Sequence, residues 1–110
     1  MEINWTPQAI DSLIETIHFI HDHLGNNVAR KIRLMIEKKV GLLAENSLLG
    51  KVAEEYAFNQ TEFRFLIINK KCKVFYFIND GCVHIVLVWD NRQDIIGLKT
   101  VSYTHLTLPT

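Results

Sequence analysis

The sequence has no apolar run long enough to cross a bilayer and no excess of either charge. A membrane span needs about 18 or more apolar residues in succession, and the N-terminus lacks the basic-then-apolar pattern of a signal peptide. Twelve Lys and Arg balance twelve Asp and Glu, which argues against attraction of the whole molecule to nucleic acid or anionic lipid. We therefore expect a cytoplasmic protein with no membrane partner.

Cysteines are scarce and the common catalytic signatures are missing. Cys72 and Cys82 are too few for a disulfide framework, and neither belongs to a CxxC pair. His18, His21 and His23 lie close together in the sequence, but no fourth ligand accompanies them, and His21 at the edge of a core explains them better than a metal. Glycine-rich phosphate loops, GxSxG and HExxH are absent from the sequence. We therefore predict no metal and no cofactor.

The composition is that of one globular domain. Of the 110 residues 48% are apolar and 22% are charged, which excludes a disordered chain or a coiled coil, and the length suits one core. The last ten residues contain no Lys, Arg, Asp or Glu and show no helical period. We expect a domain over residues 1–96 and an atypical tail, a non-native run-on, over 97–110.

Two amphipathic helices are expected in the first half of the chain, after a short extended start at residues 3–5. Thr6 as N-cap and Pro7 at the first helical position begin the first helix, and Gly25 provides its C-terminal cap. The link between the two helices is only about two or three residues long, so the helices must fold back on each other as an antiparallel hairpin. The expected core residues are Ile10, Leu13, Ile14, Ile17 and Leu24 of the first helix and Ala29, Ile32, Ile36, Val40 and Leu43 of the second.

From residue 45 the pattern changes to that of strands. Turns are expected at 69–71 and 79–81, the second with an Asp-Gly pair that tolerates positive φ. The fold class is therefore α+β: a short N-terminal strand and an antiparallel helical hairpin packed on one face of a small antiparallel β-meander. The expected strands are a weak one at 51–58 and three rich in Phe, Ile and Val at 63–69, 72–78 and 83–89.

The last hairpin is expected to be apolar on both faces. With Asp80 and Gly81 in the turn, Phe77 faces His84, and Phe75 faces Val86 across the ladder. A helical hairpin covers only one face, so the chain's own ends or another protein must cover the second. The first face carries Val74, Tyr76, Ile78, Val83, Ile85, Leu87 and Trp89, and the second carries Phe75, Phe77, Val86 and Val88.

The zero net charge hides an uneven distribution. Residues 1–29 carry four acids and no Lys or Arg, whereas residues 30–51 and residues 64–73 each carry a net charge of plus four. Lys31 and Lys38 stand a heptad apart on the outward side of the second helix, with Leu34 between them. An acidic peptide or helix could dock across this row; the alternative is an ordinary solvated face.

One further set of residues comes from three neighbouring strands: Arg64, Lys73, Arg92 and His84. Gathered at one end of the sheet, they could bind phosphate groups or stabilise the charge of a transition state. The alternative is that Arg64 and Arg92 form structural salt bridges with nearby acids. The acidic candidates are Glu54, Asp90 and Asp94.

Over about residues 3–95 these segments resemble the toxins of the RelE/ParE superfamily of bacterial toxin–antitoxin modules. The closing segment is similar to that of the ParE branch. The resemblance implies the fold above and a cognate antitoxin whose C-terminal segment wraps the toxin. The matching pieces are Trp5-Thr6, Gly50-Lys51-Val52, Phe63-Arg64-Phe65-Leu66, Lys73-Val74-Phe75-Tyr76 and Trp89-Asp90-Asn91-Arg92-Gln93-Asp94.

The two branches imply different chemistry. RelE-type toxins cut messenger RNA on the ribosome without a metal, and the resemblance makes Arg64, Lys73 and Arg92 the candidate catalytic residues. However, Leu66 stands where that branch has a second lysine, and no Tyr or His follows Arg92 at the expected place. ParE-type toxins instead block DNA gyrase by binding. The departures favour a ParE-like, plasmid-stabilising toxin. A RelE-like endoribonuclease and an inactive antitoxin-binding member are the alternatives.

The resemblance also implies the partners and where they bind. A cognate antitoxin would cover the second sheet face and the row on the second helix. DNA gyrase is the expected target, the ribosome and messenger RNA are the targets under the alternative, and a homodimer is compatible with the sequence. The expected antitoxin contacts are Phe75, Phe77, Val86, Val88, Lys31, Leu34 and Lys38.

Overall fold

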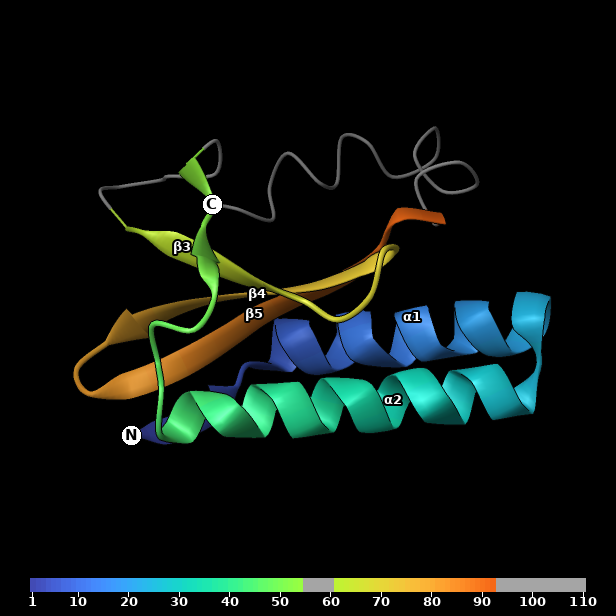
Figure 1. The fold of residues 1–110 in the computed structure, drawn as a ribbon, viewed down its shortest axis with the longest axis horizontal. Coiled ribbons are helices and arrows are strands. Elements are labelled where there is room, and N and C mark those ends of the chain that lie inside the picture. Colours follow the sequence, from blue (N-terminus) through green and yellow to red (C-terminus); the bar gives the residue numbers. More distant parts are fainter. Residues whose placement is uncertain (55–60, 93–110) are drawn as a thin grey trace.

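The computed structural model describes residues 1–54 and 61–92, which form a helical layer on one face of a five-stranded sheet (Figure 1). The strand order is β1-β5-β4-β3-β2. The predicted tail at 97–110 lies outside the described residues. The elements are β1 (Glu2–Trp5), α1 (Pro7–Leu24), α2 (Asn26–Gly41), the 3-10 helix η1 (Leu42–Ala44), β2 (Lys51–Val52), β3 (Phe63–Ile67), β4 (Cys72–Asn79) and β5 (Cys82–Asp90).

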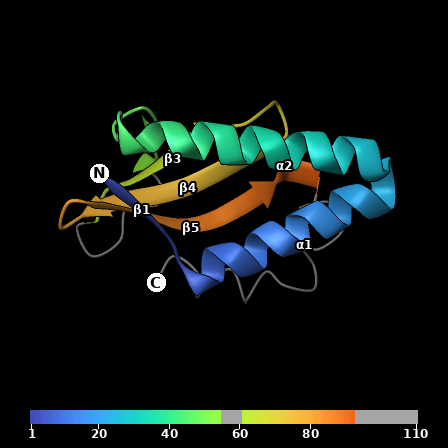
Figure 2. The ribbon, with the colours of Figure 1, turned by 90° about the horizontal axis from the view of Figure 1, so that it is seen from below.

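The predicted helical hairpin is confirmed, with Thr6 and Gly25 as the predicted caps of α1, whereas α2 begins after Gly25 without a side-chain cap. The Thr6 hydroxyl accepts a hydrogen bond from Ala9 N at 3.1 Å and donates one to Ile85 O at 2.6 Å, so one side chain caps α1 and ties it to β5. Gly25, at a φ of 94°, separates the two helices. From this turn the helices diverge beneath the sheet (Figure 2). No helix of the described residues is long and apolar enough to span a bilayer.

The helix α2 buries the predicted face, whereas α1 is rotated from its predicted orientation. All five predicted core residues of the second helical segment are buried, and Leu13 and Ile17 of α1 pack partly against the core. The residues that α1 buries fully are Ala9, Thr16 and Ile20, and the predicted core residues Ile10, Ile14 and Leu24 are 43%, 49% and 42% exposed.

The edge of β5 explains this rotation. Strand β1 pairs with β5 only as far as Ile85, so the edge beyond it needs other hydrogen-bond partners. Val88 N donates to Ser12 Oγ at 2.9 Å, and Thr16 Oγ1 donates to Val88 O at 3.3 Å. Because α1 must turn these two hydroxyls toward the strand, part of its apolar stripe faces away from the core.

The predicted meander is confirmed as β3–β4–β5, although the whole sheet is mixed. Strand β1 pairs with β5 in parallel. The turn between β4 and β5 has Asp80 and Gly81 at φ values of 52° and 70°, as a tight hairpin requires. The weak strand predicted at 51–58 extends over Lys51–Val52 only, with residues 53 and 54 outside it and 55–58 outside the described residues.

Candidate functional site

A β-bulge in β5 determines which residues face away from the helices. Tyr76 pairs with Ile85, whereas Phe75 pairs with Leu87, so Val86 is an extra residue in β5. The predicted pairing of Phe75 with Val86 is therefore wrong. Beyond the bulge the alternation of the two faces is reversed, because one added residue turns each following side chain to the other face.

This reversal corrects the predicted faces of the last strand. Val88, predicted on the second face and as an antitoxin contact, pairs with Val74 and is fully buried in the core. Leu87 and Trp89, predicted beneath the helices, are half-buried on the opposite side. We call that side the outer face. By register it carries Phe63, Phe65, Ile67, Lys73, Phe75, Phe77, His84, Leu87 and Trp89.

Aromatic rings from three strands contact one another on the outer face. Phe63 meets Phe77 edge to face with centroids 5.7 Å apart, and Phe65 lies 5.9 Å from Phe75. Phe77 stacks on His84 with ring centroids 4.9 Å apart. The predicted cross-strand pairing of these two residues is confirmed. Phe63 and Phe65 were not among the residues predicted for this face, although the turn at 69–71 aligns β3 with β4. The ring contacts form two groups on this face, Phe63–Phe77–His84 and Phe65–Phe75.

Two polar side chains are fitted to this surface. Lys73 Nζ lies 4.7 Å from the centroid of the Phe65 ring, a cation–π contact. On β1, Asn4 Nδ2 lies 3.1 Å from His84 Nδ1, which orients the imidazole. Within residues 1–54 and 61–92 no helix or strand covers the outer face, since both helices lie on the other side (Figure 1). Among the described residues the helices therefore cover one side of the sheet only, and the apolar second side that was predicted is present.

Arg64 is used inside the fold rather than on the outer face. Its Nη1 donates to Gly50 O at 2.8 Å and its Nη2 to Glu62 Oε1 at 3.2 Å. The hydroxyl of its cross-strand partner Tyr76 donates to Ser47 O and accepts from Gly50 N, each at 2.8 Å. Burial raises the pKa of Tyr76, so the hydroxyl keeps its proton. Arg64 and Tyr76 together fix the loop before β2.

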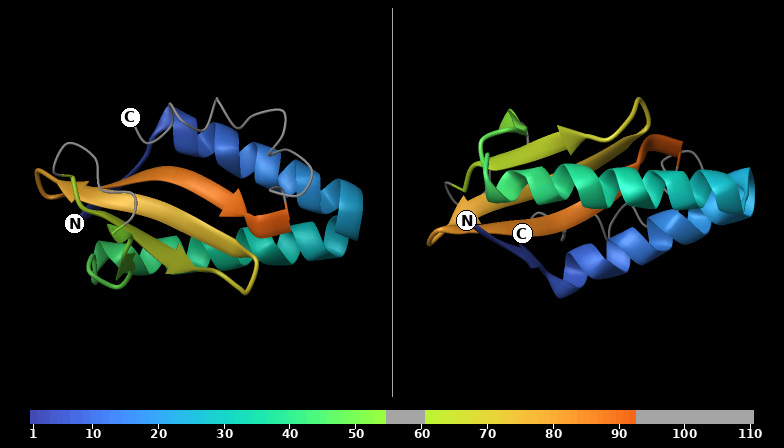
Figure 3. Two further views of the ribbon diagram at one scale, coloured as in Figure 1. Left: turned by 90° about the horizontal axis from the view of Figure 1, so that it is seen from above. Right: turned by 60° about the horizontal axis from the view of Figure 1, so that its bottom comes forward.

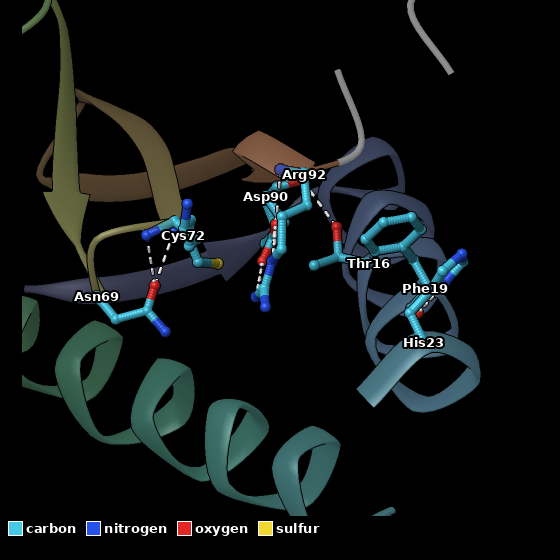
Figure 4. Close-up of polar contacts among 9 residues, drawn as sticks. Thr16, Phe19, His23, Asn69, Cys72, Asp90 and Arg92 are labelled. Carbon is cyan, nitrogen blue, oxygen red and sulfur yellow. Dashed lines mark hydrogen bonds and ion pairs between the residues drawn. The ribbon is translucent and has the colours of Figure 1, made fainter. Parts of the chain in front are cut away.

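Arg92 forms the structural salt bridge that was the alternative to a phosphate site. Its Nε and Nη2 donate to the two carboxylate oxygens of the fully buried Asp90 at 2.8 and 2.7 Å, and its backbone N donates at 2.9 Å (Figure 4). The hydrogen bond to Asp90 raises the pKa of Arg92, which keeps the guanidinium charged. This bidentate pair closes the end of β5.

Cys72 lies beside this ion pair and is chemically inert in the folded protein. It pairs with Asp90 across the ladder and is fully buried (Figure 4). Burial, with a smaller contribution from the Asp90 charge, raises the pKa of Cys72 to about 12. Because the nucleophile is the thiolate, this site offers no nucleophilic cysteine near neutral pH. Both cysteines are free thiols.

The three basic candidates do not form one cluster in the described structure. Lys73 lies on the outer face against Phe65. Arg64 pairs across the ladder with Tyr76, whose buried side chain belongs to the opposite face. Arg92 is held by the buried Asp90. Each cation therefore has a different neighbour, and Arg64 and Lys73 lie on opposite faces of the sheet.

The predicted row on α2 is exposed. Lys31 and Lys38 are exposed, and Leu34 between them has 57% of its surface exposed. Their place on the outward side of the helix is confirmed, and their role as antitoxin contacts stays a prediction.

The three histidines of α1 also lie in solvent. His21 is exposed, so its predicted position at the edge of the core is wrong, because α1 is rotated toward β5. His23 stacks on Phe19 at 4.3 Å and contacts its backbone oxygen. The described residues include no group of three or more His, Cys, Asp or Glu that could hold a metal ion.

Comparison with known proteins gives a family match and a structural match. The family described as "ParE toxin of type II toxin-antitoxin system, parDE" matches residues 3–95. A solved structure described as "Chromosomal ParDE TA system from P. aeruginosa" contains a similar chain, with a TM-score of 0.66 and 18% identity. The match covers 82% of this chain and 95% of that one. At this identity the likeness concerns the fold. No curated protein sequence matches.

Proposed function

This chain belongs to the ParE toxin family of type II toxin–antitoxin systems, and we propose that it inhibits growth by binding DNA gyrase until a cognate antitoxin neutralises it. The outer face carries this proposal. Its aromatic side chains are half-buried, and no helix or strand of the described residues covers them. Large apolar patches on soluble proteins mark sites of protein–protein interaction.

The chemistry of the outer face suits an extended segment with apolar and acidic residues. Phe75 and Phe77 present rings for apolar side chains, and Lys73 presents a cation beside them. An antitoxin that continues around the sheet edge would meet the row of Lys31, Leu34 and Lys38 with its acidic residues.

A binding activity fits the basic residues better than RNA cleavage does. Arg64 and Arg92 are engaged with carbonyl groups and carboxylates of the chain itself, and Lys73 is placed on the other face of the sheet. General acid–base chemistry needs its groups together around the reacting atoms. These contacts favour a target bound by surface complementarity.

A supercoiling assay with purified DNA gyrase tests the target. We expect the purified chain to inhibit supercoiling at micromolar concentration and its expression to arrest growth. Growth arrest without gyrase inhibition, accompanied by codon-phased cuts in messenger RNA, would contradict the proposed target. Expression without growth arrest would indicate an inactive antitoxin-binding member.

A binding titration tests the antitoxin site. The probe is the protein encoded by the small reading frame adjacent to this gene. We expect Phe75→Glu to weaken binding at least about 100-fold, because it places a charge in an apolar contact. The matched control is Leu48→Glu, which places the same charge on an exposed leucine of the loop before β2. Equal loss in both variants would contradict the assigned face.

A further inference from the structure

The outward surface of the helical layer has one acidic side and one basic side. On α1, Asp11, Glu15 and Asp22 are exposed, and this helix contains no Lys or Arg. On α2, Lys31 and Lys38 are exposed on the outward side. Helix periodicity places each set along one side of its helix. We call the first set the acidic row and the second the basic row.

Within the described helices these charges are not neutralised across the layer. The ion pairs of α1 and α2 are His21–Asp22 at 3.5 Å and Arg33–Glu37 at 3.1 Å, each within a single helix. The helices diverge from Gly25, which separates the two rows further along the hairpin (Figure 3). The outward surface of the described helices is therefore dipolar, and no ion pair joins the acidic row to the basic row.

An exposed apolar side chain lies within each row. Ile14 is 49% exposed beside Asp11 and Glu15, and Leu34 is 57% exposed between Lys31 and Lys38. Single exposed apolar residues are common. Here the two exposed apolar residues lie at matching positions in rows of opposite charge. When the two rows meet, the apolar side chains contact each other and the charges around them pair.

We propose that the helical layer is a homodimer interface, in which α1 of each copy packs on α2 of the other. A two-fold axis along the bisector of the hairpin produces this arrangement and makes the interface isologous. The same rotation gives α2 of the second copy the inclination to the axis that α1 has in the first copy. The two helices therefore lie along each other, and the divergence of the hairpin does not prevent the contact.

The axis fixes the register of the contact. Rotation about an axis along the hairpin does not change how far a residue lies from the turn at Gly25, measured along that axis. Asp11 and Lys38 lie nearly equally far from Gly25 along the chain, and so do Ile14 and Leu34. At about 1.5 Å of rise per helical residue, each of these residues meets its complement in the second copy within one turn.

The charges also select this arrangement over the other symmetric one. An axis across the hairpin would pack α1 on α1 of the second copy, acid against acid, and α2 on α2, base against base. Like charges across an interface suppress association. A second copy placed with α1 on α2 satisfies both rows at once.

This dimer would cover residues that the proposed function assigns to the antitoxin. Lys31, Leu34 and Lys38 would be buried by the second copy, so antitoxin and self-association would compete for them. That consequence rests on the proposed function. The dimer itself does not, because it requires neither gyrase nor antitoxin.

Sedimentation equilibrium of the purified chain tests the interface. We expect a dimer that forms with rising concentration, weakens with salt, and loses at least about tenfold in affinity in Ile14→Glu and in Leu34→Glu. The control is Ile67→Glu, at a residue 43% exposed on the opposite side of the sheet, which should leave the affinity unchanged. A chain that is monomeric at every soluble concentration overturns the proposal, and so does a dimer that both helix variants leave intact.

A charge exchange tests the partners. Lys38→Glu should weaken the dimer several-fold, and adding Asp11→Lys should restore it, because the exchange recreates both symmetric pairs. No recovery in the double variant overturns the assigned register. If the chain stays monomeric and Ile14→Glu abolishes binding of the protein from the adjacent reading frame, the layer belongs to the antitoxin and the proposal is overturned.

Cross-linking tests the orientation. In a Cys82→Ser background, a mixture of Ile14→Cys chains and Leu34→Cys chains should form disulfide-linked dimers, whereas each variant alone should not. The buried Cys72 does not compete for oxidation. Cross-linking of Ile14→Cys with itself would show α1 on α1 and overturn the arrangement.

Discussion

The strands β4 and β5 contribute alternate residues to the two faces of the sheet, and the two faces differ in what packs against them. On the inner face Val74, Tyr76 and Ile85 are fully buried beneath the helices. Polar groups on that side, such as the Tyr76 hydroxyl, have hydrogen-bond partners within the chain. On the outer face the rings contact one another but remain half-buried. The inner face stabilises the fold, and the outer face is the one to which we assign partner binding.

The sharpest test of this comparison substitutes two residues on either side of the bulge. Ile85→Ala should lower the free energy of unfolding by about 2–5 kcal/mol, because it opens a cavity in a packed core. Leu87→Ala, on the outer face, should cost about 1 kcal/mol or less. Chemical denaturation measures both. Equal losses would show that the outer face is as much part of the core as the inner one.

The next largest effect concerns Arg92. Arg92→Ala should destabilise the protein by about 1.5–3 kcal/mol, because it removes charge-assisted hydrogen bonds from the buried carboxylate of Asp90. Denaturation and growth arrest should be measured on the same variant. Full stability with lost toxicity would make Arg92 part of the toxic site and remove it from the structural side of the comparison.

Alkaline pH should lower the free energy of unfolding through Cys72, which is buried on the inner face. The folded protein holds the pKa of this thiol at about 12, above its ordinary value of 9.0, so the unfolded chain loses the proton first as the pH rises. The contribution is complete below about pH 9 and is lost progressively up to about pH 12, by at most about 1.4 kcal/mol per pH unit. Unfolding of Cys72→Ala should show a shallower decline over this range, and identical slopes would contradict the assignment.

A small effect on stability is also expected for the ring pairs of the outer face. Phe65→Leu removes the contacts with Phe75 and Lys73 but keeps an apolar side chain, so we expect a loss of about 0.5–1.5 kcal/mol. Antitoxin affinity should fall by more than this stability change accounts for. An affinity that follows stability alone would remove the functional distinction between the two faces.

The sequence predicted elements better than it predicted faces. The face of α2 was correct because that helix lies on the sheet and its apolar period decides its burial. The buried face of α1 was predicted wrongly, because Ser12 and Thr16 form hydrogen bonds with the edge of β5. These bonds are needed only along the part of β5 that lies beyond the end of β1. The bulge at Val86 likewise depends on how two strands align, and apolar residues on both sides of it give no sequence signal.

The candidate site was predicted in part for the same reason. Phe75 and Phe77 lie on β4, which has no extra residue, so their placement on the outer face was correct. Val88 lies beyond the bulge in β5 and was misplaced. The grouping of Arg64 with Lys73 failed because the pairing of β3 with β4 puts them on opposite faces, which the turn at 69–71 already implied.

The parallel pairing of β1 with β5 has a consequence for synthesis. β1 is translated before every other described element, yet β5, its strand partner in the described sheet, is translated after every other described strand. The helical hairpin can form while the chain emerges, but this edge of the sheet must wait for β5. A ribosome that stalls before β5 would therefore release a fragment unable to complete either face.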